Sequence, residues 1–292
     1  MSLLSRMMAC AAVVLAANCS FAENKKLLLV TDSGGFVHDS VGLAEQILKE
    51  VGLKNGIDVT CYRYTRDPES KDFAKYAEQF RKTTGVAVEK ENTGRVNAET
   101  LKKFDCVLFF TTGNPLSNDE VAELVSWVKA GGAVAGVHCG SDTLYPAKDR
   151  PNNAAFGELI GAYFDGHPWH QKIKIKNEDP EHAAGKGFKT GDEITDEIYQ
   201  FRPEPYSRGK LHVILSVDNA SIDVSKGKRK DQDYAVAWCQ DVEKGRSFYS
   251  SLGHRKDVWK DPRFQEHLIG GLKWAMKDAK GDATPSAKSA KQ

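Results

Sequence analysis

The sequence predicts an α/β fold whose central sheet is parallel and covered by helices on both faces. Strand-like segments are continuously apolar, as in residues 104–113 (FDCVLFFTTG), where a half-exposed strand would alternate with polar residues. Segments with apolar residues at helical spacing follow two of these strands, and further strands come after them. Continuous apolar strands are typical of a sheet buried on both sides, and alternation of strands with helices favours parallel order.

The first half of the chain is expected to contain four strands and two helices. The expected strands are residues 25–32, 57–64, 104–113 and 133–138. The expected helices are residues 40–56 and 117–132. Ser40 is a candidate N-cap of the first helix, and Ser117 with Glu120 has the spacing of a capping box for the second. Glycines follow both helices and are typical helix stops.

The second half is expected to complete one domain over residues 23–279. Its expected strands are residues 171–176, 211–218, 234–240 and 245–253, some of which alternate and are therefore half exposed. Residues 261–279 form an expected closing helix. Residues 61–100 and 140–170 are long connections, and such connections tend to carry function. Residues 280–292 are rich in Ala, Lys and Ser and are predicted to be a disordered tail.

Residues 1–22 have the pattern of a secretory signal peptide. Arg6 precedes the apolar run ACAAVVLAA, which is too short to span a bilayer as a mature helix. Ser20 and Ala22 place small residues before a cleavage site at Glu23. The sequence therefore predicts a periplasmic or secreted protein with no membrane contact after cleavage. A lipoprotein anchored through Cys19 is the alternative, although Asn18 fits the required small-residue box poorly.

The charge and the cysteine content exclude few function classes, but they make some binding partners less expected than others. Cleavage would remove Arg6 and no acidic residue, which leaves 40 basic against 40 acidic residues. The sequence has no basic stripe of the kind a nucleic-acid binder needs, so nucleic acid is not an expected partner. The four cysteines outside the signal peptide form no CxxC pair and resemble buried small hydrophobes, which leaves disulfides undetermined: Cys61, Cys106, Cys139 and Cys239. The sequence also leaves open whether the chain forms a homo-oligomer.

Polar residues at strand ends are the candidates for a site, because open α/β sheets bind ligands beyond the carboxyl ends of their strands. Three different strands are followed by a histidine: His38, His138 and His254. The segment FDGHPWH adds His167 and His170. Gly113 and Asn114 end a further strand.

Five segments in order resemble the ThuA-like (trehalose utilization) family. They are VTDSGGFVHDS, GVHCGSDT, FDGHPWH, TDEIYQF and VAWCQDVEKGRSFYSSLGH, and the resemblance covers roughly residues 25–276. It implies a fold similar to class I glutamine amidotransferases, a flavodoxin-like three-layer α/β/α sandwich with a mostly parallel central sheet and a Gly-rich nucleophile elbow. It also implies a role in bacterial disaccharide catabolism through 3-keto sugar intermediates.

The amidotransferase elbow has the form G-x-C-x-G, whereas this chain has Gly136-Val137-His138-Cys139-Gly140. His138 therefore takes the apex, whose side chain points into the site, and Cys139 falls one residue late. Glutamine amidotransferase chemistry at the Cys139 thiol is not expected.

The motif TDEIYQF implies Glu197 as the site carboxylate with Tyr199 on the same face. Asp196 and Glu197 are adjacent, so in a strand only one of them can enter the site. The other candidates for substrate contact each have a structural alternative. Asp142 could bind a sugar hydroxyl or cap a helix, and Arg246 could contact substrate or form a buried ion pair. Trp169 could stack on a sugar or be a packing residue.

Two mechanisms fit these residues. In the first, His138, His38, His254, His167 and Glu197 are general acids and bases that act next to a keto group, giving isomerisation, epimerisation, elimination or hydrolysis of a small sugar or keto glycoside. In the second, several of the same residues hold a divalent metal that polarises the sugar oxygens. No HExxH or HxH spacing supports a local metal motif, so a metal site would have to be assembled from distant segments.

A non-catalytic carbohydrate-binding protein that has lost the amidotransferase nucleophile is the alternative function. Binding alone needs aromatic platforms and neutral amides, whereas several histidines at one rim are a costly arrangement for binding. The sequence therefore favours an enzyme, with a small carbohydrate as its partner.

Overall fold

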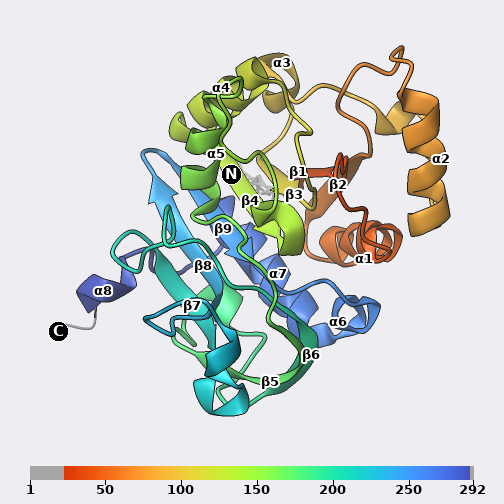
Figure 1. The fold of residues 1–292 in the computed structure, drawn as a ribbon. Helices are drawn as coiled ribbons and strands as arrows, with labels where there is room; N and C mark the ends of the chain where they lie inside the picture. Colours follow the sequence, from red (N-terminus) through yellow and green to blue (C-terminus); the bar gives the residue numbers. More distant parts are fainter. Residues whose placement is uncertain (1–22, 290–292) are drawn as a thin grey trace, which may run out of the picture.

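The computed structural model describes residues 23–289, which form a nine-stranded sheet flanked by helices (Figure 1). The strand order is β2-β1-β3-β4-β9-β8-β7-β5-β6. The strands are β1 Lys25–Val30, β2 Ile57–Tyr62, β3 Cys106–Phe109, β4 Ala133–Val137, β5 Trp169–Asn177, β6 Glu193–Ile198, β7 His212–Val217, β8 Ala235–Val242 and β9 Gly245–Ser250. The helices are α1 Val41–Lys54, α2 Phe73–Thr84, α3 Ala98–Leu101, α4 Asn118–Lys129, α5 Asn153–Ile160, α6 Lys256–Lys260, α7 Pro262–Ala275 and α8 Ser286–Ser289.

The predicted signal peptide and Cys19 fall in residues 1–22, outside the described residues. Export and lipidation therefore stay predictions. None of the described helices combines the length and the hydropathy that crossing a bilayer requires.

The parallel half of the sheet comprises β2, β1, β3, β4 and β9. Alternate residues of β1 enter two separate apolar cores, because successive strand side chains point to opposite faces. Leu27 and Leu29 pack with residues of α1 and α7, whereas Leu28 and Val30 pack with residues of α4 and α5. Both faces are therefore covered, as the continuous apolar strands predict.

The remaining strands are antiparallel, and the prediction of a mostly parallel sheet is wrong. The four pairs β9–β8, β8–β7, β7–β5 and β5–β6 are all antiparallel. Glu243 and Lys244 alone join β8 to β9, and a two-residue connection can only make a hairpin. The strands β5 to β9 lie between α5 and α6, and the only helical segments that the structure describes among them are short 3-10 turns. These turns are too short for parallel crossovers. The sheet is thus mixed, and the flavodoxin-like sandwich is not confirmed.

Two other segments differ from the sequence prediction. The connection over residues 61–100 contains α2, which has a narrow apolar stripe and buries only Phe80. Residues 280–289, predicted as part of a disordered tail, lie along β7. There the backbone N–H groups of Ser286 and Ala287 donate to the carbonyls of Leu211 and Arg208. The ring of His212 also donates to the Thr284 carbonyl at 2.7 Å.

The predicted helix caps have different outcomes. Ser117 and Glu120 form the expected capping box at α4. Ser40 stands at the N-cap of α1, but its hydroxyl makes no cap hydrogen bond and points instead to the Gly253 carbonyl. Ser40 therefore ties α1 to the segment that precedes α6.

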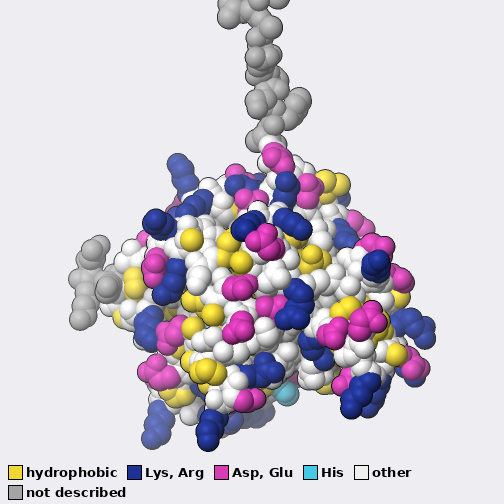
Figure 2. All heavy atoms as spheres, turned by 90° about the horizontal axis from the view of Figure 1, so that it is seen from above, with side chains coloured by type: hydrophobic (Ala, Val, Ile, Leu, Met, Phe, Trp, Pro, Cys, Tyr) yellow, Lys and Arg dark blue, Asp and Glu magenta, His cyan; other side chains and the backbone are white. Residues whose placement is uncertain are grey.

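Acidic and basic side chains are interspersed on the face seen in Figure 2. That face carries no continuous basic stripe among its described residues. Its charge pattern is that of an ordinary solvated surface, with no feature there that favours a nucleic-acid partner.

His267 of α7 is buried and fully paired in the core. Its Nδ1–H donates to the Ala184 carbonyl at 2.6 Å, and its Nε2 accepts from the Ser250 hydroxyl at 3.0 Å. Burial lowers the pKa of His267 to about 4. The folded protein therefore holds this ring neutral at a pH where an unfolded chain would protonate it.

We predict that the free energy of unfolding falls as pH decreases from about 6.5 toward 4, because the unfolded chain takes up the proton first and the folded chain does not. The stability that His267 contributes is fully present above about pH 6.5. Urea unfolding at pH 7.5, 6.5 and 5.0 measures the slope. The variant His267→Gln should show a smaller decrease between pH 6.5 and 5.0 than the wild type. The control His170→Gln changes an exposed ring and should keep the wild-type slope; equal slopes in all three proteins would contradict the prediction.

Candidate functional site

Four residues from distant segments meet beyond the carboxyl ends of the parallel strands. We call His38, His138, Glu197 and His254 the His/Glu cluster. One ligating atom from each lies within 4.8 Å of those of the others. His38 follows β1, His138 directly follows β4, His254 follows β9, and Glu197 belongs to β6. The sequence prediction that these histidines converge is thus matched by the geometry.

Glu197 reaches the His/Glu cluster because the antiparallel half of the sheet bends back over it. In the strand order, β6 is five steps from β4, which would be about 24 Å in a flat sheet. The Oε2 atom of Glu197 nevertheless lies 3.5 Å from Nε2 of His138. β5 pairs with β6 through Trp169–Lys174 and with β7 only through Ile175–Asn177, so the β5–β6 ribbon leaves the main sheet.

His138 occupies the apex of the predicted elbow. Its φ of 46° is in the left-handed region, which is strained for a residue with a side chain. The flanking glycines allow the tight turn. A Cβ at Gly140 would lie 2.7 Å from the Phe109 carbonyl oxygen, and one at Gly136 would lie 2.9 Å from the Tyr249 ring. Cys139 points the other way into the apolar core, where burial raises the pKa of its thiol well above the usual range.

The ring of His138 is oriented by its second nitrogen. Nδ1 lies 2.9 Å from the carbonyl oxygen of Ser251, which can only accept, so the Nδ1–H donates and the neutral ring keeps a lone pair on Nε2. The side chain is fully buried. Tyr249 adds a hydrogen bond from its hydroxyl to the His138 backbone carbonyl. In the neutral form of the ring, the elbow therefore directs the lone pair of Nε2 toward the His/Glu cluster.

Three polar atoms surround Nε2 of His138. The Tyr199 hydroxyl lies at 2.9 Å, Nδ1 of His254 at 3.3 Å and Oε2 of Glu197 at 3.5 Å. Nδ1 of His254 is also 3.3 Å from the same Glu197 oxygen. A single lone pair on Nε2 accepts one hydrogen bond, so hydrogen bonding alone does not account for all of these contacts.

The electrostatics of the His/Glu cluster favour an ionised Glu197. Burial raises the pKa of this carboxyl, but hydrogen bonds and charge interactions with His138 and His254 outweigh it and the net shift is downward. The hydrogen bond to Glu197 in turn raises the pKa of His254, against the opposing effect of burial. Glu197 therefore carries a negative charge, and His254 holds its proton to a higher pH than an isolated imidazole does.

His38 differs from the other histidines because it is buried without a polar partner. Only 5% of its surface is exposed, and its Nδ1 has no hydrogen bond. Its ring meets that of His138 edge-on at 4.8 Å and that of His254 at 5.3 Å. Burial, reinforced by the neighbouring His138 and His254, lowers the pKa of His38 to about 2. His38 is thus a neutral imidazole with an unused donor atom.

His167 and His170 form the solvent side of the site. Nδ1 of His167 lies 3.5 Å from Oε1 of Glu197, the oxygen that the His/Glu cluster does not use, and its side chain is half exposed. His170 is paired directly opposite Glu197 in the β5–β6 register, and its ring is 5.3 Å from that of His254. Both lie next to the His/Glu cluster, with His167 closer to the carboxylate.

Several predicted substrate contacts lie elsewhere. Trp169 is a core residue that donates to the Asp223 carbonyl and packs edge-on against Tyr234, so it offers no free face to a sugar. Arg246 sits at the start of β9, at the opposite end from His254, and contacts Asp241 and the Trp274 ring. Both have the structural role that was the alternative in the sequence analysis.

The remaining predicted contacts hold loops in place. Gly113 exchanges backbone hydrogen bonds with Asp142 and Leu144. The Asn114 side chain accepts from Asn153. Asp142 is half-buried, and burial raises the pKa of its carboxyl. Only Tyr199 of the predicted substrate-binding residues makes a direct polar contact with the His/Glu cluster.

Asp196 is a positioning residue that the sequence did not predict. It is fully buried, and its carboxylate accepts the backbone N–H of Gly253 at 2.7 Å and of Arg255 at 3.1 Å. Asp196 therefore fixes the backbone on both sides of His254. The alternation in β6 that sends Glu197 into the site sends Asp196 to the other side, so the pair DE carried this signal.

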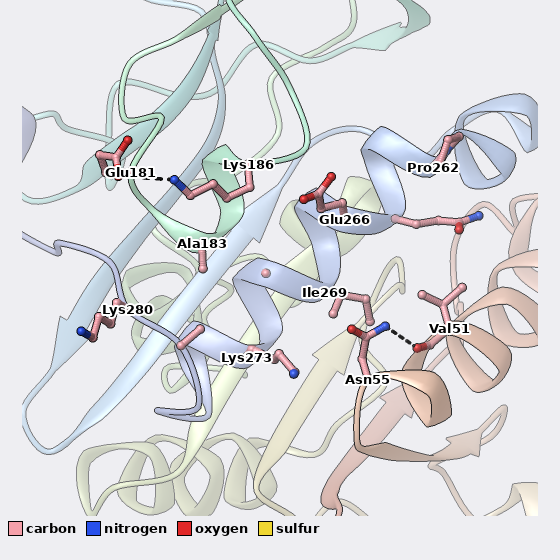
Figure 3. Close-up of a pocket in the computed structure, with 13 residues that line it drawn as sticks. Val51, Asn55, Glu181, Ala183, Lys186, Pro262, Glu266, Ile269, Lys273 and Lys280 are labelled. Carbon is pink, nitrogen blue, oxygen red and sulfur yellow. Dashed lines mark hydrogen bonds and ion pairs between the residues drawn. The ribbon is translucent and has the colours of Figure 1, made fainter.

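A separate hollow of about 550 Å³ lies along α7, between the end of α1 and the loop around residues 183–185 (Figure 3). Figure 3 shows long charged side chains at its rim, among them Lys186, which pairs with Glu181 at 3.4 Å, and Lys273. None of the predicted site residues lines it. The hollow is therefore distinct from the His/Glu cluster.

Comparison with known proteins gives matches over most of the described residues. A sequence model of the ThuA family, described as trehalose utilisation, matches residues 26–275. A protein from Bacteroides uniformis ATCC 8492 described as ThuA-like is similar in structure, with a TM-score of 0.59, 18% identity, and coverage of 91% of this chain and 98% of that one. A ThuA-like protein from Parabacteroides merdae ATCC 43184 gives a TM-score of 0.60 at 16% identity, over 89% and 92% of the two chains. No protein of curated function matches the chain in sequence.

Because Cys139 is buried with a raised thiol pKa, we predict that it resists alkylation in the folded protein. Iodoacetamide at pH 8 should modify it at least about 100-fold more slowly than in urea-unfolded protein, as the reagent needs an exposed thiolate. Mass spectrometry of the peptide that contains Cys139 gives both rates. Comparable rates in the two states would mean that the thiol faces the site.

Proposed function

The chain belongs to the ThuA family of trehalose utilisation, and on that premise we propose that it is an enzyme acting on a small keto sugar or keto glycoside. The family associates the chain with carbohydrate metabolism. The reaction that we propose is proton transfer at a carbon next to the keto group. The observation that carries the proposal is the position of Glu197, whose carboxylate lies between His138 and His254 on one side and His167 on the other.

The two oxygens of Glu197 support two different roles. Oε1 faces His167 at the half-exposed rim, where a sugar can enter. An ionised carboxylate there can take a proton from the carbon next to the carbonyl, and His167 can relay it. Oε2 faces His254, whose raised pKa suits a group that gives its proton to the carbonyl oxygen.

The step balances as an enolisation. The C–H bond breaks as Glu197 takes the proton, its electron pair forms the C=C bond, and the carbonyl oxygen receives the proton of His254. Return of a proton to either carbon gives an isomer or epimer. Departure of a β-substituent gives an elimination product. Tyr199 and His138 orient this pair, since the Tyr199 hydroxyl contacts Nε2 of the apex ring.

The burial of the titratable groups supports an enzyme over a binding protein. Holding His38 without a hydrogen-bond partner costs about 1–3 kcal/mol, a cost that a pure sugar-binding site has no reason to carry. Trp169, the sugar-stacking candidate that the sequence suggested, is committed to the core. A non-catalytic carbohydrate-binding protein is the alternative that the experiment below distinguishes.

Export belongs to the proposal as well. It rests on the signal-peptide pattern of residues 1–22, with a small-residue site before Glu23. An exported enzyme of this kind would meet its sugar in the periplasm or outside the cell. Lipidation at Cys19 would give the same location with a membrane anchor.

Incubation of the purified protein with 3-keto disaccharides tests the function, with products followed by NMR. We expect turnover by the wild type, and a loss of at least about 100-fold in kcat for Glu197→Gln, since general acid–base groups contribute about 10²–10⁴-fold. His138→Ala should also lower kcat, because it removes the ring that orients Glu197 and His254. The matched control is Cys139→Ala, the residue next to the apex, which should keep its rate within about threefold because its side chain lies in the core.

Two outcomes contradict the proposal. Saturable binding of the keto sugar with no product in the wild type would identify a binding protein. Loss of activity in Cys139→Ala with full activity in His138→Ala would return the chemistry to the thiol.

A further inference from the structure

We propose that the His/Glu cluster binds one divalent transition-metal ion of the zinc class, with His38, His138, His254 and Glu197 as its ligands. The role of that ion, polarising the sugar carbonyl, rests on the function proposed above. The binding itself rests only on the arrangement of the four side chains.

The distances within the His/Glu cluster have the size of a coordination shell. Ligands held at about 2.0–2.2 Å from a tetrahedral ion lie about 3.3–3.5 Å from one another. The three pairs among His138 Nε2, His254 Nδ1 and Glu197 Oε2 are separated by 3.3, 3.3 and 3.5 Å. His38 supplies the fourth donor within 4.8 Å of the others. These three atoms thus have the spacing of one face of a tetrahedron, and the His38 donor would complete it by moving closer.

His38 gives a second, independent indication of a ligand. It is more than nine-tenths buried, packed against Phe36 and Phe110, and its Nδ1 has no hydrogen-bond partner. Buried polar atoms in folded proteins are nearly always paired, so an unpaired one calls for an explanation. A metal ion accounts for it, because a neutral imidazole lone pair is what a transition metal binds.

The surrounding hydrogen bonds also match a metal site. A metal-binding histidine generally donates its other ring N–H to a carbonyl or carboxylate, which fixes the tautomer. His138 does this through Nδ1 and the Ser251 carbonyl, leaving Nε2 for the ion. Asp196 fixes the loop of His254 through two backbone N–H groups. Glu197 keeps its second oxygen beside His167 at the rim.

The ligand types select the ion. Three imidazoles and one carboxylate suit Zn²⁺ and neighbouring transition metals, whereas Mg²⁺ and Ca²⁺ prefer oxygen ligands alone. The ion would face solvent on the side of His254, whose side chain is one quarter exposed. That side is open to a sugar carbonyl or hydroxyl, which would bind as a fifth ligand. The bound ion would then supply Lewis-acid polarisation of the carbonyl in place of the proton of His254.

Tyr199 makes the contact that competes with a metal. Its hydroxyl lies 2.9 Å from Nε2 of His138, the atom that the ion would use. Tyr199 is buried, and a phenol is a weaker metal ligand than an imidazole or a carboxylate. On metal binding its hydroxyl would have to turn from Nε2. Replacing it with phenylalanine therefore removes a competitor and leaves the four ligands in place.

Titration of tag-free protein, treated with chelator and desalted, tests the inference. Calorimetry with Zn²⁺ and absorbance with Co²⁺ should give about one ion per chain with a sub-micromolar dissociation constant and the strong visible bands of tetrahedral Co²⁺. His38→Ala and His254→Ala should each weaken binding by at least about 100-fold while circular dichroism stays unchanged. His170→Ala, a neighbouring exposed histidine, should bind within threefold of wild type, and Tyr199→Phe as tightly or more tightly.

Absence of saturable metal binding in the wild type would overturn the inference. Wild-type affinity for the metal in both His38→Ala and His254→Ala would overturn it as well. Turnover by metal-free protein at the full rate would overturn the role of the ion and leave the proposed function standing. A third outcome separates the two proposals. If the wild type binds one ion per chain, both variants lose this binding, and the wild type turns over no keto sugar, the metal site is upheld and the proposed function is contradicted.

Discussion

The hydrogen bond between Nδ1 of His138 and the Ser251 carbonyl is the constraint on which the site depends. It places the ring proton on the side away from the site, so the lone pair of Nε2 points into the His/Glu cluster. The elbow strain at His138 and the close backbone approaches at Gly136 and Gly140 hold the ring where this bond can form. Tyr199, His254 and Glu197 are arranged around the nitrogen that results.

The second constraint is the bend of the sheet. The parallel half supplies three histidines at its carboxyl edge, but no acidic group of those strands joins the His/Glu cluster. β5 divides its pairing between β7 and β6, and the ribbon that leaves the sheet carries Glu197 to the histidines. Asp196, the neighbour of Glu197, then fixes the loop of His254. One strand thus supplies the carboxylate and positions a histidine.

The sequence predicted the histidines of the site well and the sheet less well. Apolar strands each followed by His38, His138 or His254 imply convergence, since parallel strands end at one edge. The sequence did not predict the antiparallel half, although only Glu243 and Lys244 join β8 to β9. It left Trp169 and Arg246 open between substrate contact and packing, because their core partners, Tyr234 and Trp274, lie far away in sequence. Long-range partners of this kind follow from the fold alone.

The protonation of the His138 ring in metal-free protein tests the central claim most directly. Nitrogen-15 NMR of the histidine side chains distinguishes the two tautomers, and comparison with His138→Ala identifies the signals of this residue. The account predicts that the neutral form of the ring carries its proton on Nδ1 and none on Nε2, as the Ser251 carbonyl requires. A neutral ring with its proton on Nε2 would contradict it, because the lone pair would then point away from a substrate or a metal.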